Sequence, residues 1–217
     1  MMKLVIFDLD GVIVSTDKYH YQAWKSLADE YNFIFSEEIN HMLRGVSRAE
    51  SLKIILDVNG RAIEPEEFAV MLEKKNSIYK KSLDDLKEED ILPGVLDLLT
   101  NLNKHNIMVA IGSSSKNTPL ILKQIGLSES FDIIIDGNCI TNSKPDPEVF
   151  LKGAEGLGIA PSDCVVYEDA EAGIEAALAA GMYAIGVGEH HLKHADYMAG
   201  SMIGESYETI LKRFGGR

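Results

Sequence analysis

The chain has 217 residues and a formal net charge of -13, with 46% hydrophobic and 25% charged residues. These values are ordinary for a globular protein and exclude a disordered or fibrous chain. The acidic balance argues against a general affinity for nucleic acid or for an anionic membrane surface, because both attract basic patches. An anionic substrate would therefore need local cations.

Cysteine usage and the N-terminus bear on the cellular compartment. Cys139 and Cys164 stand far apart without a CxxC spacing, so they predict neither a disulfide framework nor a zinc site. The apolar run at the N-terminus is interrupted by Asp8, which makes it too short for the core of a signal peptide. No stretch approaches the length of a membrane span. We expect a cytoplasmic protein that does not bind membranes.

Five short runs rich in β-branched and aromatic residues predict buried strands. They cover residues 3–7, 107–111, 131–135, 164–167 and 183–187. Helical patterns accompany the later runs, at residues 94–104, 119–125, 147–157 and 172–180. This alternation predicts right-handed βαβ units and an α/β fold, a Rossmann-like doubly wound parallel sheet. Gly181 is expected to end the last of these helices.

A segment between the first two strands breaks the alternation, because it has helical periodicity and high charge but no convincing strand. Tyr19, Trp24 and Tyr31 lie on an apolar stripe at helical spacing, and we expect them to build the core of this region. An inserted α-helical cap domain follows from this pattern. The expected division is a core domain of residues 1–15 and 93–217 and a cap domain of residues 16–92.

Four of the expected strands are followed by polar side chains, which lie directly after the strand or in the loop that follows it. Ligands of open α/β sheets bind beyond the carboxyl ends of the strands, so these side chains are considered together. They are Asp8 and Asp10, Ser113 to Ser115, Lys144, and Glu168 with Asp169. Carboxylates, hydroxyls and one ammonium in this set indicate a metal-assisted phosphoryl transfer.

The two aspartates that follow the first strand suit different tasks. Asp8 is the expected nucleophile, because a carboxylate can attack phosphorus to form an aspartyl phosphate. Asp10 could protonate a leaving oxygen and then deprotonate an incoming hydroxyl. Asp8 and Asp169 could hold Mg²⁺, and Glu168 could add a further oxygen.

Two more groups are expected at the transferring phosphate. Ser113 can donate a hydrogen bond to it, and Lys144 can supply positive charge. Pro145 disfavours the helical region for Lys144, so this lysine is expected in an extended turn. Each signal is weak alone, and the prediction depends on their order and spacing.

The segment DLDGVIVST, the serine after IMVAIG, the lysine of NSKPDPEVF and the acidic pair of YEDAEAG resemble the haloacid dehalogenase (HAD) superfamily. The resemblance covers nearly the whole chain and implies a HAD-like core and a phosphoprotein intermediate. It implies that Mg²⁺ is held by Asp8, the Asp10 backbone carbonyl, Glu168 and Asp169. It also implies that the transferring phosphate is surrounded by Ser113, Ser114 and Lys144.

The cap segments TDKYHYQAW, LRGVSRAES and EKKN are similar to sugar-phosphate mutases of this superfamily. The resemblance implies a magnesium-dependent isomerase of carbohydrate metabolism that interconverts β-D-glucose 1-phosphate and glucose 6-phosphate, with β-glucose 1,6-bisphosphate as the activating intermediate. Thr16 and His20 are implied to couple cap closure to catalysis. The implied substrate-binding residues are Arg48, Ser115, Lys116 and Asn117 at the second phosphate, and Gly45, Val46, Ser51, Lys75 and Asn76 near the sugar. Small sugar phosphates are the expected partners of a monomer.

Several patterns have a local structural interpretation. Ser47 and Glu50 form S-x-x-E, which predicts a helix capping box, and Arg48 at that helix start suits an anion. Thr118 followed by Pro119 predicts an N-cap and a first helical residue. A surface turn is favoured over a metal site for His190, His191 and His194.

Two rival functions share part of this site. A HAD-type sugar-phosphate phosphatase uses Asp8 in the same way, but it needs one phosphate site where a mutase needs two. A phosphoaspartate binding or signalling module is disfavoured by the complete acid, metal and lysine set. Ser15, Ser114 and Ala170 replace the aspartate, alanine and serine frequent in the family, so they leave the partition between mutase and phosphatase open.

Overall fold

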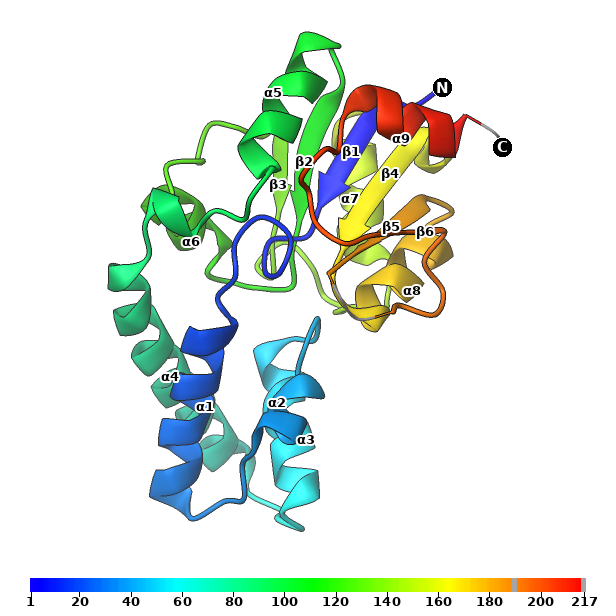
Figure 1. The fold of residues 1–217 in the computed structure, drawn as a ribbon. Coiled ribbons are helices and arrows are strands. Elements are labelled where there is room, and N and C mark those ends of the chain that lie inside the picture. Colours follow the sequence, from blue (N-terminus) through cyan, green and yellow to red (C-terminus); the bar gives the residue numbers. More distant parts are fainter. Residues whose placement is uncertain (189–190, 216–217) are drawn as a thin grey trace.

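The computed structural model describes residues 1–188 and 191–215 (Figure 1). Its centre is a six-stranded sheet with the order β3-β2-β1-β4-β5-β6, in which all neighbouring strands are parallel. The strands are β1 (Leu4–Phe7), β2 (Met108–Gly112), β3 (Ile133–Ile135), β4 (Cys164–Glu168), β5 (Tyr183–Val187) and β6 (Tyr197–Ala199). This is the order of a doubly wound sheet, so the predicted α/β fold is confirmed.

Helices cover both faces of the sheet. One face carries α5 (Val95–Lys104), α6 (Thr118–Gln124) and α9 (Tyr207–Phe214), and the other carries α7 (Glu148–Gly156) and α8 (Glu171–Ala179). Within β1, Val5 and Phe7 join the first face, whereas Leu4 and Ile6 join the second. A strand buried on both sides needs a continuous apolar run, which β1 provides.

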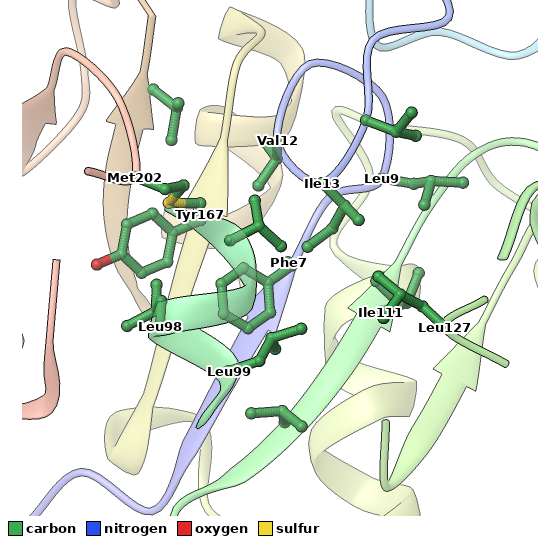
Figure 2. Close-up of a cluster of buried hydrophobic side chains, with 14 of the residues drawn as sticks. Phe7, Leu9, Val12, Ile13, Leu98, Leu99, Ile111, Leu127, Tyr167 and Met202 are labelled. Carbon is green, nitrogen blue, oxygen red and sulfur yellow. The ribbon is translucent and has the colours of Figure 1, made fainter. Parts of the chain in front are cut away.

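The first face holds the larger apolar cluster, shown around Phe7 in Figure 2. The Phe7 ring stacks on Tyr167 of β4 with 5.5 Å between ring centroids, and Leu98 and Leu99 of α5 belong to the same cluster. These buried contacts hold β1 and β4 side by side at the centre of the sheet. The polar residues after both strands are thereby brought to one edge.

Four further helices lie beyond the carboxyl edge of the sheet (Figure 1). They are α1 (Asp17–Tyr31), α2 (Glu37–His41), α3 (Arg48–Val58) and α4 (Pro65–Ser82), and 3₁₀ turns at Leu83–Asp85 and Glu88–Asp90 follow them. Trp24, Leu52 and Met71 belong to a separate apolar cluster of these helices. Tyr31 packs against that cluster, but Tyr19 does not. The expectation for Tyr19 is wrong, because the first turn of α1 lies close enough to the sheet for Tyr19 to join its core.

The helix ends refine the local predictions. Ser47 Oγ accepts a hydrogen bond from Glu50 N at 3.2 Å, so Ser47 is the N-cap of α3, but the Glu50 carboxylate accepts from Lys53 and only half of the predicted capping box forms. The N-cap of α6 is Asn117, and the prediction that Thr118 occupies this position is wrong. Thr118 is already helical, and its hydroxyl donates to Ser115 O at 2.9 Å. Gly181, at φ 75°, follows the end of α8 as expected.

Among the described residues, none of the helices has the length and apolar character needed to cross a membrane. The domain boundaries expected at residues 15/16 and 92/93 stay a prediction.

Candidate active site

The strand order places the candidate site where β1 and β4 lie next to each other. Asp8 follows β1, and Glu168 is the last residue of β4. Lys144 reaches this edge from the loop before α7, and its Nζ donates to Asp8 Oδ1 and to Glu168 Oε2, the latter at 2.8 Å. Lys144 is 2% exposed and Glu168 is fully buried. Side chains from three distant parts of the chain therefore form one buried charge group.

Oxygen atoms of Asp8, Glu168 and Asp169 lie within 4.8 Å of one another. Two glycines make room for them. A Cβ at Gly11, which has φ +83°, would lie 2.1 Å from Asp169 Oδ2, and a Cβ at Gly173 would lie 2.0 Å from Glu168 Oε2. Carboxylate oxygens gathered in this way are the donors that hard divalent cations prefer, so the group fits a metal ion.

Burial and neighbouring charges shift the pKa values of this group. Burial raises the pKa of Glu168 to about 7, against the opposing effect of Lys144. Burial and the adjacent Glu168 carboxylate raise the pKa of Asp169 well above its usual range. Burial alone would lower the pKa of Lys144, but Asp8 and Glu168 outweigh it and raise that pKa. One ammonium does not balance these carboxylates, which is a second sign that the group suits a cation.

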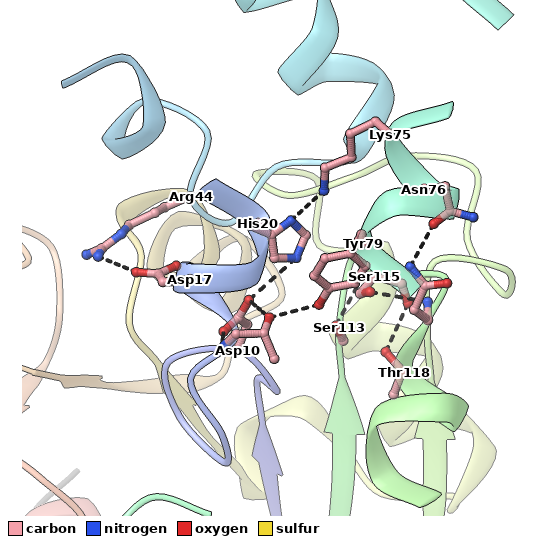
Figure 3. A network of polar contacts seen from close by, with 12 residues as sticks. Asp10, Asp17, His20, Arg44, Lys75, Asn76, Tyr79, Ser113, Ser115 and Thr118 are labelled. Atoms are coloured by element: carbon pink, nitrogen blue, oxygen red, sulfur yellow. Dashed lines mark hydrogen bonds and ion pairs between the residues drawn. The ribbon is translucent and has the colours of Figure 1, made fainter. Parts of the chain in front are cut away.

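Asp10 has different neighbours from Asp8. Thr16 N donates to Asp10 Oδ1 at 2.7 Å, and the Thr16 hydroxyl donates to Asp10 Oδ2 (Figure 3). Burial and the Asp17 carboxylate raise the pKa of Asp10 to about 7, although the Thr16 hydrogen bonds act in the opposite direction. A carboxyl group that exchanges its proton near neutral pH suits an acid and base.

His20 and Lys75 lie on the cap side of Asp10 (Figure 3). His20 Nε2 is 3.7 Å from Asp10 Oδ2, and His20 Nδ1 is 2.8 Å from Lys75 Nζ. Lys75 is only 1% exposed, and its Nζ also lies over the rings of Trp24 and Tyr79. Burial lowers the pKa of both His20 and Lys75, and nearby cationic groups add to the effect. Lys75 is therefore a buried cation and not part of an exposed, solvated helix face.

The loop after β2 touches the cap at two points. Asn117 Nδ2 donates to Asn76 Oδ1 of α4 at 2.9 Å, and the Ser114 hydroxyl donates to Gly45 O at 3.3 Å. Ser113 is buried, and its hydroxyl accepts from Ser115 N at 3.1 Å. The loop thus lies between the strand edge and the cap.

A cavity of about 330 Å³ separates the strand edge from the cap. Most of the residues predicted for the site line it: Asp8, Asp10, His20, Gly45, Val46, Arg48, Ser51, Lys75, Asn76, Ser113, Ser114, Ser115, Lys116, Asn117 and Asp169. Thr16, Lys144 and Glu168 do not line it. They lie behind the wall, where they contact Asp10 or Asp8. Their individual roles stay predictions.

Some residues around the cavity escaped the sequence analysis. Arg44 and Asp17 both line it and form an ion pair with each other (Figure 3). Thr141 and Ser143 line it from the loop before Lys144. The sequence offered one signal for these four residues, which is that each is polar and lies close to a predicted site residue in the chain. Tyr79 is different, because it lies in the helical stripe of α4 and only the folded chain brings it to Thr16.

The histidine-rich segment lies away from this cavity. His191 is exposed, and His194 Nδ1 pairs with Glu171 and lies 3.9 Å from Glu175 Oε1. His190 lies outside the described residues. These three described side chains, Glu171, Glu175 and His194, could also surround an ion, but they are half-buried or exposed.

Comparison with known proteins agrees with this geometry. Residues 5–187 match the model of the haloacid dehalogenase-like hydrolase family. The chain is 43% identical to β-phosphoglucomutase of Bacillus subtilis over 190 residues, which cover 87% of this chain and 84% of that protein. It is 31% identical to a phosphorylated carbohydrates phosphatase of Thermotoga maritima, over 83% of this chain and 82% of that protein.

The crystal structure of β-phosphoglucomutase from Clostridium difficile superposes with a TM-score of 0.95 at 39% identity, covering 100% of this chain and 98% of that one. The strand order, the charge group at the end of β1 and the family match over most of the chain lead to the same assignment. The chain therefore belongs to the haloacid dehalogenase-like hydrolase family.

Proposed function

We propose that the chain is a β-phosphoglucomutase, an isomerase that interconverts β-D-glucose 1-phosphate and glucose 6-phosphate. Its similarity to β-phosphoglucomutases of Bacillus subtilis and Clostridium difficile extends over the sheet and the cap. The cavity between them has the size of a small-molecule site. The proposed division into a core of residues 1–15 and 93–217 and a cap of residues 16–92 places this cavity between the two.

Arg48 is the observation that favours a mutase most. It begins α3 in the cap and lines the same cavity as Asp8. Its Nη1 atom is buried and has no hydrogen-bond partner among the described residues. A buried guanidinium donor without a partner is costly unless a ligand supplies an acceptor, and a phosphate does so well. Arg48, with Lys116 and Asn117, would hold a second phosphate while Asp8 reacts with the first.

In the proposed reaction, a carboxylate oxygen of Asp8 attacks the phosphorus at C1 of β-glucose 1,6-bisphosphate, and the bond from that phosphorus to the sugar oxygen breaks, which leaves glucose 6-phosphate. Asp10 gives its proton to that oxygen. In the other half-reaction, the C6 hydroxyl of β-glucose 1-phosphate attacks the phosphoaspartate, and Asp10 takes the hydroxyl proton. The phosphate passes to the sugar and Asp8 is regenerated. β-Glucose 1,6-bisphosphate is the intermediate that links the two half-reactions.

The other residues of the site would orient the sugar and neutralise the charge of the transferring phosphate. Lys144, Ser113 and Ser114 would bind the oxygens of the transferring phosphate. Asp8, Glu168, Asp169 and the Asp10 backbone carbonyl would hold Mg²⁺, which when bound offsets charge on the phosphate. Thr16 and His20 would link the cap to Asp10. Gly45, Val46, Ser51, Lys75 and Asn76 would contact the sugar.

A sugar-phosphate phosphatase is the second candidate. The relative from Thermotoga maritima is named as such, and it matches most of this chain. Both functions begin with phosphorylation of Asp8 and differ only in whether a sugar hydroxyl or water receives the phosphate. A cap that closes over the cavity favours the sugar, because it excludes water.

The two functions are separated by following the products. The protein is incubated with Mg²⁺, β-glucose 1-phosphate and a trace of β-glucose 1,6-bisphosphate, and glucose 6-phosphate and free phosphate are measured together. We expect glucose 6-phosphate to form much faster than phosphate. Predominant release of phosphate would establish the phosphatase instead.

An Arg48→Ala variant tests the second phosphate site within the same assay. Since its guanidinium is expected to grip the distal phosphate, its loss is expected to lower kcat/KM for the mutase reaction by about 10²-fold, equivalent to about 3 kcal/mol. Labelling of Asp8 by acetyl phosphate, which has no distal phosphate, should stay within about twofold of wild type. Unchanged mutase turnover would show that the second site lies elsewhere.

A further inference from the structure

Tyr79 reaches from the cap helix α4 to the segment that holds Asp10 (Figure 3). Its side chain is 1% exposed, and its hydroxyl lies 2.9 Å from Thr16 Oγ1. Its ring packs against His20, with 4.1 Å between ring centroids, and lies 4.5 Å from Lys75 Nζ. One tyrosine thus contacts three residues that surround Asp10.

The hydrogen-bond chemistry gives this contact a direction. A threonine hydroxyl has a single proton, and in Thr16 that proton goes to Asp10 Oδ2. While Asp10 is a carboxylate it can only accept, so the Thr16 oxygen must accept from its other neighbour. The Tyr79 hydroxyl therefore donates to Thr16, and the chain of donors runs from Tyr79 through Thr16 to Asp10.

Burial makes this arrangement specific. Neither Thr16 nor Tyr79 is open to solvent, so water is not at hand to replace the tyrosine hydroxyl. Without that donor, the Thr16 hydroxyl could turn its proton away from Asp10. Thr16 N would still hold Asp10 Oδ1 at 2.7 Å, but among the described residues Asp10 Oδ2 would keep only the contact with His20 Nε2 at 3.7 Å, which is too long for a hydrogen bond.

We propose that Tyr79 is a positioning residue, whose hydroxyl fixes that of Thr16 and thereby orients the Asp10 carboxyl group toward the cavity. This rests on the proposed function in one respect, the role of Asp10 as acid and base. It adds a residue of α4 to that role. The position of the cap helix is thereby coupled to the group that moves the proton.

A Tyr79→Phe variant tests the proposal by removing one oxygen atom. Two phosphoryl donors are compared. β-Glucose 1,6-bisphosphate has a sugar oxygen as leaving group, which needs a proton from Asp10, whereas acetyl phosphate releases acetate, which does not. We expect kcat with the sugar substrate to fall by about tenfold, a part of the 10²- to 10⁴-fold that a general acid supplies. Labelling of Asp8 by acetyl phosphate should stay within about twofold of wild type.

Tyr167→Phe is the matched control. Tyr167 is also fully buried, and its hydroxyl makes one hydrogen bond, to Glu205 Oε2 at 2.7 Å, on the face of the sheet covered by α5. Its loss should lower thermal stability as much as Tyr79→Phe does and change neither donor's rate. A second test uses the Thr16→Val background. There, Tyr79→Phe should not lower kcat with the sugar substrate any further, because the hydrogen-bond chain from Tyr79 through Thr16 to Asp10 is already broken.

An equal fall with both donors would overturn the proposal, because it would mean that the hydroxyl only keeps the site folded. An unchanged rate with the sugar substrate, or an additive loss in the Thr16→Val background, would also overturn it. The proposal can fail or succeed apart from the mutase assignment. If wild type releases phosphate from sugar phosphates, the same comparison of leaving groups is made on phosphate release, since the sugar oxygen still needs its proton.

Discussion

Asp8 and Asp10 stand two positions apart in the sequence, yet the folded chain gives them opposite surroundings. Asp8 faces the Lys144 ammonium, whereas Asp10 is held by Thr16 and has its pKa raised to about 7 by burial and Asp17. A carboxylate beside a cation suits attack on phosphorus, and a carboxyl group that can keep a proton suits an acid. The same residue type therefore serves two functions because the local environments differ.

The assignment of the nucleophile leads to a prediction for Asp8→Asn. The amide has the shape of the carboxylate but is not a nucleophile for phosphorus, so we expect complete loss of labelling by acetyl phosphate. Mass spectrometry of the labelled protein measures this directly. Asp10→Asn is the control and should still be labelled, because acetate leaves without a proton. Labelling that persists in Asp8→Asn would identify a different nucleophile.

At the level of the elements, helix α7 anchors the loop that carries Lys144. Glu148 accepts backbone hydrogen bonds from Thr141 at 3.0 Å and from Asn142 at 2.7 Å. Lys152, one turn further along, pairs with Glu148 at 2.7 Å and donates to Cys139 O at 2.6 Å. Two side chains of one helix thus hold three residues of the loop before it.

The contacts of Glu148 imply a dependence of stability on pH. Lys152 and the amides of Asn142 and Thr141 lower the pKa of Glu148 to about 2 from an ordinary value of 4.5. Since the folded state favours the carboxylate, its stabilisation is complete above pH 4.5 and is lost as the pH falls toward 2. Glu148→Gln should therefore lower the melting temperature at pH 7, and the difference from wild type should shrink below pH 4.

Thermal unfolding of both proteins across this pH range measures the effect. Glu155→Gln is the matched control, since Glu155 is exposed on the same helix. A difference between wild type and Glu148→Gln that stays constant from pH 7 to pH 3 would contradict the prediction.

On the scale of the whole molecule, the cap and the sheet are joined by side-chain hydrogen bonds near the cavity. Ser114 contacts Gly45, Asn117 contacts Asn76, and Tyr79 contacts Thr16. The first two pairs join a residue beside the sheet to a residue of the cap segment, and the third lies within residues 16–92, where Thr16 holds Asp10. Phosphoryl transfer to a sugar would then take place in a cavity that both parts must close.

The charge group at the centre of the molecule predicts a strong response to Mg²⁺. Asp8, Glu168 and Asp169 lie together, and among the described residues Lys144 is the one cation paired with this group. Mg²⁺ at about 100 times its Kd should stabilise the fold by about 2.7 kcal/mol and raise the melting temperature by about 5–10 °C. EDTA should reverse this rise and abolish turnover. An Asp169→Asn variant should lose the rise, and a full rise in that variant would exclude Asp169 as a ligand.

The sequence predicted five strands because each is a short run rich in β-branched and aromatic residues, but it did not predict β6 or α9. β6 has three residues at the edge of the sheet, too few to show a pattern of burial. α9 packs on the sheet through one buried residue, Ile210, and is marked by the Ser206 N-cap. Tyr19 was misassigned because a helical stripe does not reveal which of two apolar clusters its ends join.

By itself the sequence determined the fold class, the family and the residue types at the ends of the strands, because periodicity and short motifs are local properties. Only the tertiary structure decided which of these groups touch. It brought Lys144 between Asp8 and Glu168, buried Lys75 beside His20 and set Tyr79 against Thr16. It also left Arg48 Nη1 without a hydrogen-bond partner in the part of the chain that the structure describes. Contacts between residues far apart in the chain depend on how the sheet, loops and cap pack, and no local pattern records them.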